Sequence, residues 1–119
     1  MEVLIQCLLA FIALQHFGFL VLEMFLWDKQ PGMKVFRLDA DFAKKSKSLA
    51  MNQGLYNGFL AAGLVWSLVA EESMRVPLAL FFTGCVIVAG IFGAATVSKR
   101  IFWVQAVPAL IAFGLNWMR

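Results

Sequence analysis

The chain has 119 residues, of which 62% are hydrophobic, and a formal net charge of +3. Its mean hydropathy of +0.83 leaves too little polar surface for a soluble domain of this size, and the length corresponds to a single domain, residues 1–119. Because the Lys and Arg residues flank apolar stretches, we expect them to meet anionic lipid head groups rather than nucleic acid.

The first apolar stretch covers about residues 3–27, which as a helix is long enough to cross a bilayer. It begins without a basic segment, and its apolar part is too long for a signal peptide. Trp27 is placed as an interfacial aromatic residue. Pro31 and Gly32 then predict a turn.

The connection that follows holds six of the ten basic residues and leads into a second span at about residues 48–70. Asp39 or Asp41 is expected to cap a helix that enters this span from outside the membrane. The basic residues of this connection are Lys29, Lys34, Arg37, Lys44, Lys45 and Lys47.

Two further spans are predicted at about residues 77–97 and 101–118. Pro77 suits the first turn of the third span, and Pro108 is expected to kink the fourth. The fold class that follows is all-α, a bundle of four transmembrane helices. Cys7 and Cys85 lie inside apolar stretches without metal-ligand spacing, so we expect free thiols.

The basic residues also predict an orientation. The first and third connections carry six and two of them, whereas the opposite side carries only Arg75 and Arg119. Basic connections stay on the cytoplasmic side. We therefore expect a multi-pass membrane protein with both termini outside the cytoplasm.

Polar residues gather in the first two spans. His16 and Glu23 are seven residues apart and share one helical face, and the second span carries its own polar stripe of Asn52, Gln53, Tyr56 and Asn57. If depth is counted at about 1.5 Å per residue from the cytoplasmic ends, these residues fall at matching levels. Glu23 is expected to lie level with Asn52, Gln53 and Gln105, and His16 level with Asn57.

Three interpretations of this polar cluster stay open. The amides could simply satisfy Glu23 and His16 within the bundle, or they could line a ligand-binding or reactive pocket, or they could form an ion or proton path. One His and one Glu are too few for a protein metal site, so we expect no metal. Small residues at Gly54, Gly58, Gly90 and Gly93 predict close helix packing, within one subunit or between subunits.

Two stretches carry a family resemblance: residues 16–27, which include His16 and the segment VLEMFLW, and residues 52–63, NQGLYNGFLAAG. They resemble the bacterial integral-membrane family called domain of unknown function 1304, which implies a four-span protein of the bacterial inner (plasma) membrane and no established activity. The region from Lys45 to Ala61 is also similar to the second helix of the MAPEG family. That similarity implies a MAPEG-like topology and a homo-oligomer, such as a trimer. In this helix of MAPEG proteins a Glu usually follows an Asn by three residues. The Asn corresponds to Asn52 here, and Leu55 occupies the position of the Glu.

The sequence therefore favours a small membrane protein that binds an amphipathic or lipid-like molecule in the cytoplasmic half of the membrane. The residues do not decide between binding and conversion, and they name no cofactor. In a reaction, Glu23 and His16 are the candidate acid and base. The alternative is a non-enzymatic assembly partner or small transport subunit. The candidate ligand-binding residues are Asn52, Gln53, Tyr56, Asn57, Gln105, Lys44, Lys45 and Lys47.

Overall fold

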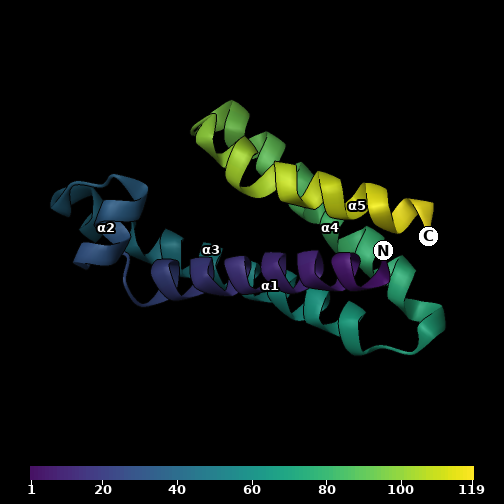
Figure 1. Ribbon diagram of the computed structural model, residues 1–119. Coiled ribbons are helices and arrows are strands. Elements are labelled where there is room, and N and C mark those ends of the chain that lie inside the picture. The colour runs from purple at the N-terminus through teal and green to yellow at the C-terminus, as the bar shows by residue number, and fades with distance from the viewer. The chain divides into compact units, whose positions relative to one another are not determined.

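A computed structural model describes all 119 residues, and it is built from helices without β-strands (Figure 1). The prediction of an all-α fold is confirmed. The elements are α1 (Glu2–Met24), α2 (Gln30–Phe36), α3 (Ala40–Val69), α4 (Glu72–Thr96), the π-helical turn η1 (Phe102–Ala106) and α5 (Val107–Met118).

Two of these helices, α1 and α4, are long and apolar enough to cross a membrane. Helix α3 has 30 residues, but its amide side chains lower the hydropathy of the half that would lie in the bilayer. The last apolar helical segment, Phe102–Met118, is shorter than the other two. By length and composition, two helices qualify as candidate spans, and the predicted bundle of four is not confirmed.

The chain divides into two compact units. The terminal unit comprises Met1–Ala13 and Leu60–Arg119, and the middle unit comprises Leu14–Phe59. Helices α1 and α3 each contribute residues to both units.

The terminal unit is held by an apolar core to which four helices contribute. Helix α1 supplies Ile5, Leu9 and Ile12, which recur at intervals of three and four residues and so share one face. Helix α3 supplies Leu64, and α4 supplies Val86. All five side chains are fully or almost fully buried. The remaining buried members are Ala13, Ala79, Ala109 and Ala112.

Helix α5 runs alongside α4 in this unit, and η1 packs against α4 as well (Figure 1). A Cβ atom at Gly90 would lie 2.8 Å from the backbone nitrogen of Ala106. The small-residue face of α4 is therefore used inside the chain.

The π-helical turn lies directly before Pro108. In this turn Val107 donates its backbone N–H to the carbonyl of Phe102, five residues earlier. A proline cannot donate a backbone hydrogen bond, and its ring crowds the carbonyl four residues before it. The wider turn relieves this crowding.

The prediction that Pro77 lies in the first turn of its helix is wrong. Helix α4 begins at Glu72, so Pro77 lies inside the helix.

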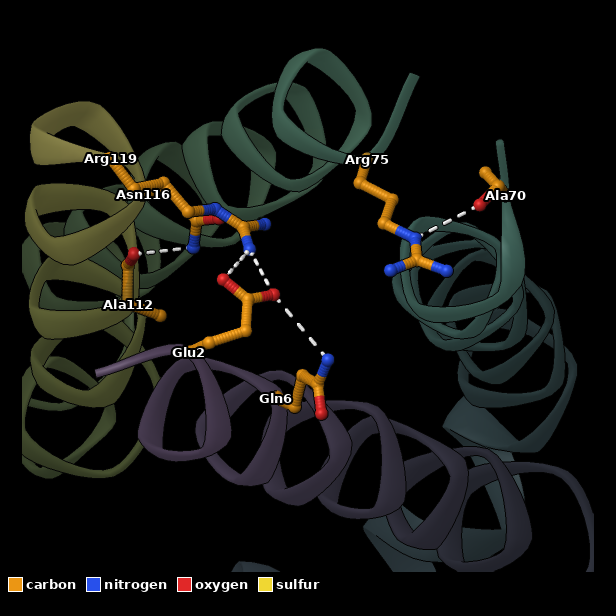
Figure 2. A network of polar contacts seen from close by, with 7 residues as sticks. All are labelled: Glu2, Gln6, Ala70, Arg75, Ala112, Asn116 and Arg119. Carbon is orange, nitrogen blue, oxygen red and sulfur yellow. Dashed lines mark hydrogen bonds and ion pairs between the residues drawn. The ribbon is translucent and has the colours of Figure 1, made fainter. Parts of the chain in front are cut away.

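The first and last helices of the terminal unit are joined by an ion pair (Figure 2). Arg119 Nη1 donates to both carboxylate oxygens of Glu2, at 2.6 and 2.7 Å. Gln6 donates to the same carboxylate, while Arg75 Nε donates to the carbonyl of Ala70 at 3.0 Å. Only 14% of the Arg119 side chain is exposed, so this end of the unit is tied by a partly sheltered pair.

In the middle unit, the connection between α1 and α3 is ordered by side chains at both ends. Asp39, one of the two predicted alternatives, is the residue that caps α3. Its Oδ1 accepts a hydrogen bond from the backbone N–H of Phe42 at 2.8 Å. Helix α2 ends at Arg37, whose φ of 55° lies in the left-handed region without the help of glycine. The ring of Trp27 packs against that of Phe36 at a tilt of 44°, with the ring centroids 5.0 Å apart.

The close packing at Gly90 gives a test of the fold. Gly90→Ala should lower the thermal midpoint of the purified protein in detergent, since the new methyl group would meet the Ala106 backbone. Gly114→Ala is the matched control, because no atom lies within 4 Å of its Cβ position. This control should be neutral or stabilising, since Ala favours a helix over Gly by about 1 kcal/mol. Equal midpoints for both variants would contradict the close approach.

Candidate functional site

The central contact of the middle unit joins α1 to α3 through a buried carboxyl group. Asn57 Nδ2 donates a hydrogen bond to Glu23 Oε1 at 2.5 Å. Only 7% of Glu23 and 6% of Asn57 are exposed. A carboxyl group removed from water needs such a partner, whichever protonation state it adopts.

Glycines on α3 let the two helices come this close. A Cβ atom at Gly54 would lie 2.6 Å from Met24 Cγ and 3.1 Å from Glu23 Cβ. A Cβ atom at Gly58 would lie 2.6 Å from Leu20 Cδ1. Because these two glycines have no side chains, α1 packs closely against α3 on either side of Asn57.

His16 lies two turns before Glu23 on α1 and is fully buried. Its ring meets the edge of Phe19 at a centroid distance of 5.5 Å, with the planes 79° apart. The position fits an interior histidine in an aromatic setting. The chain has no group of three or more His, Cys, Asp or Glu residues that could hold a metal ion.

The remaining polar residues of α3 point elsewhere. Asn52 and Gln53 are exposed, as is Tyr56, which keeps 54% of its surface and meets the edge of Phe59. The sequence placed Asn52 and Gln53 level with Glu23, whereas the hydrogen-bonded amide is that of Asn57. The levels differ because Glu23 lies in the last turn of α1 while Asn57 lies 17 residues after the start of α3, so the first turns of α3 extend beyond the end of α1.

Two of the three lysines predicted to attract an anionic group form ion pairs within the chain. Lys47 binds Asp28 at 3.1 Å, and Lys45 binds Asp41 at 3.0 Å on a largely exposed part of α3. The hydrogen bond from Lys47 lowers the pKa of the Asp28 carboxyl below its ordinary value. Lys44 is exposed and takes part in none of the ion pairs.

Gln105, the last predicted ligand-binding residue, lies in η1, and its side chain is half-buried. It belongs to the terminal unit, whereas Glu23 and Asn57 belong to the middle unit. Cys7 and Cys85 are free thiols.

One feature of the middle unit carried no signal in the sequence. Trp27 Nε1 donates to Ser46 Oγ at 2.9 Å, and Ser46 in turn donates to the carbonyl of Phe42 at 2.7 Å. The sequence does not indicate this pair, because Trp27 and Ser46 are 19 residues apart and serines are common at helix surfaces. This pair fixes the turn after α1 against the first turns of α3.

The geometry is that of an all-α protein with candidate membrane helices and a buried carboxyl–amide pair, and comparison with known proteins gives its family. The family described as "Protein of unknown function (DUF1304)" matches residues 10–117. The chain belongs to this family. It is also 27% identical over 114 residues to the "Uncharacterized protein YpaA" of Lactococcus lactis subsp. lactis (strain IL1403).

That alignment covers 94% of this chain and 95% of the relative. No solved structure matches the chain. The resemblance to the family of domain of unknown function 1304 is confirmed, and the resemblance to the MAPEG family is not.

The Glu23–Asn57 pair gives a second test. Glu23→Leu leaves the buried amide of Asn57 without its acceptor and should destabilise the protein by about 1–3 kcal/mol. Glu23→Gln keeps an oxygen in the same place and should stay close to wild type. Thermal unfolding in detergent measures both variants. If the two lose equal stability, the negative charge matters to the fold and the hydrogen bond alone does not account for the contact.

Proposed function

We propose that this chain is a four-span inner-membrane protein that binds an amphipathic, lipid-like molecule along the exposed polar face of α3. The observation that carries the proposal is the exposure of Asn52, Gln53 and Tyr56 on a helix that continues into an apolar half. We call these three side chains the amide face. In hydrocarbon, exposed amides need a hydrogen-bonding partner from outside the chain.

The charge around the amide face favours an anionic polar group on the ligand. Lys44 and Lys45 lie about two turns before Asn52 on the same helix, and both are exposed. An anionic group at Lys44 would place the rest of a head group against Asn52 and Gln53. An apolar tail would then follow exposed Leu55 and Phe59 along α3.

Glu23 has a supporting place in this proposal. Its carboxyl group is buried with Asn57 behind the amide face, where it holds α3 against α1. If the ligand is converted as well as bound, Glu23 and His16 remain the candidate acid and base. Binding itself depends on the amide face.

A second candidate function is supported by the same exposed side chains. Amides on a membrane helix can also hydrogen-bond to another helix, so the amide face could serve a second copy in a homo-oligomer, a trimer among them, or a different membrane protein. The chain would then be an assembly partner or a small transport subunit.

Substitution of the amide face separates the two functions. Asn52→Leu combined with Gln53→Leu should release the small molecule that co-purifies with the protein, while thermal stability is kept because both residues are exposed. Native mass spectrometry and a lipid extract of the purified protein measure this release. Leu49→Ala, at a side chain that is 76% exposed on the same helix, is the control.

If the double variant instead keeps its bound molecule and changes its oligomeric mass, the assembly function is correct. If it keeps both the bound molecule and the mass, the amide face serves neither function.

The orientation can be tested with single cysteines in a chain where Cys7 and Cys85 are replaced by Ala. Ser73→Cys and Ser98→Cys lie at exposed positions in the second and third connections. An impermeant maleimide should label Ser73→Cys in intact cells. It should label Ser98→Cys only after the membrane is opened. Labelling of Ser98→Cys in intact cells would reverse the proposed orientation.

A further inference from the structure

We infer that the groove between the end of α4 and η1 binds one anionic phospholipid, independently of the amide face. The groove has a volume of about 380 Å³ and lies within the terminal unit. It is lined by Ile91, Ala94, Ala95, Lys99, Phe102 and Trp103. Its volume falls in the range of about 300–1,000 Å³ that is typical of small-molecule sites.

The groove owes its shape to the way α4 ends. Ala94 and Ala95 leave the surface of the last turn of α4 low, and η1 follows after a short connection. Phe102 and Trp103 stand beside this low surface with their rings edge to face, 5.5 Å apart and 86° inclined. The small residues thus form the floor and the aromatic rings one wall.

The surface around the groove is suited to hydrocarbon. Trp103 is 69% exposed, and Ile91, Phe92 and Val88 are 50–69% exposed on the neighbouring turns of α4. Such a continuous apolar surface on a protein with candidate spans α1 and α4 fits acyl chains better than water. One chain of a lipid can lie along the floor of the groove.

The charge at one end of the groove selects the head group. Lys99 is exposed, lines the groove and takes part in none of the chain's ion pairs, and Arg100 follows it directly. A cation beside an apolar groove and an exposed Trp is complementary to a lipid phosphate. The apolar lining favours a lipid over free phosphate as the occupant.

The test uses the full chain in a neutral detergent and defined lipids. Native mass spectrometry should find one tightly held palmitoyl-oleoyl phosphatidylglycerol, and much weaker binding of the zwitterionic phosphatidylcholine with the same chains. Lys99→Gln should weaken phosphatidylglycerol binding about fivefold, since a basic residue near an anionic surface contributes on that scale. Lys99→Arg should restore binding.

Two variants control for charge and for shape. Lys34→Gln removes the same charge at an exposed site on α2 and should leave the bound lipid in place. Ala95→Leu fills the floor of the groove from an exposed position and should expel the lipid with the charge intact.

Three results would overturn the inference. They are equal binding of phosphatidylcholine, equal effects of Lys99→Gln and Lys34→Gln, and displacement of the lipid by millimolar inorganic phosphate. The Asn52→Leu and Gln53→Leu double variant should keep the phosphatidylglycerol. Failure of the amide-face proposal is therefore measured separately from failure of this one.

Discussion

A carboxyl group that is taken out of water must be given a partner, and in this chain the partner of Glu23 is the amide of Asn57. The other features of the middle unit follow from that contact. Gly54 and Gly58 have no side chains because α1 must come close enough for the hydrogen bond. With α1 and α3 set at that separation, Trp27 can reach Ser46, and Asp28 can reach Lys47.

The same contact determines which polar residues stay available. A helix turns about 100° per residue, so when Asn57 faces α1, Asn52 and Tyr56 point well away from it, while Gln53 lies one turn before Asn57 and beyond the contact between Glu23 and Asn57. They are left on the outer surface. A buried, satisfied pair and an exposed polar face are therefore two sides of one helix. This is why the structural interpretation of Glu23 and a binding role for α3 are compatible.

The sequence correctly predicted most of the features that depend on residues close together in the chain. The cap at Asp39 was one of two alternatives, and the clustering of small residues on α4 correctly indicated a close helix contact at Gly90. The level predicted for Glu23 was wrong by about a turn, because the sequence does not show how far the first turns of α3 extend beyond the end of α1. Pro108 was expected to kink its helix. In the structure a π-helical turn lies directly before Pro108, and its last residue, Ala106, packs against Gly90 of another helix.

The stretches of sequence that form the two units affect the order in which the chain can fold during translation. The middle unit is continuous in sequence and has all of its residues once Phe59 has been synthesised. The terminal unit combines the first 13 residues with the last sixty, and its closing ion pair joins residues 117 positions apart. During translation, Ile5 and Leu9 must wait for α4 and α5. Lipid tails can shelter them in the interval, whereas the residues of the Glu23–Asn57 contact are both present as soon as the middle unit has been synthesised.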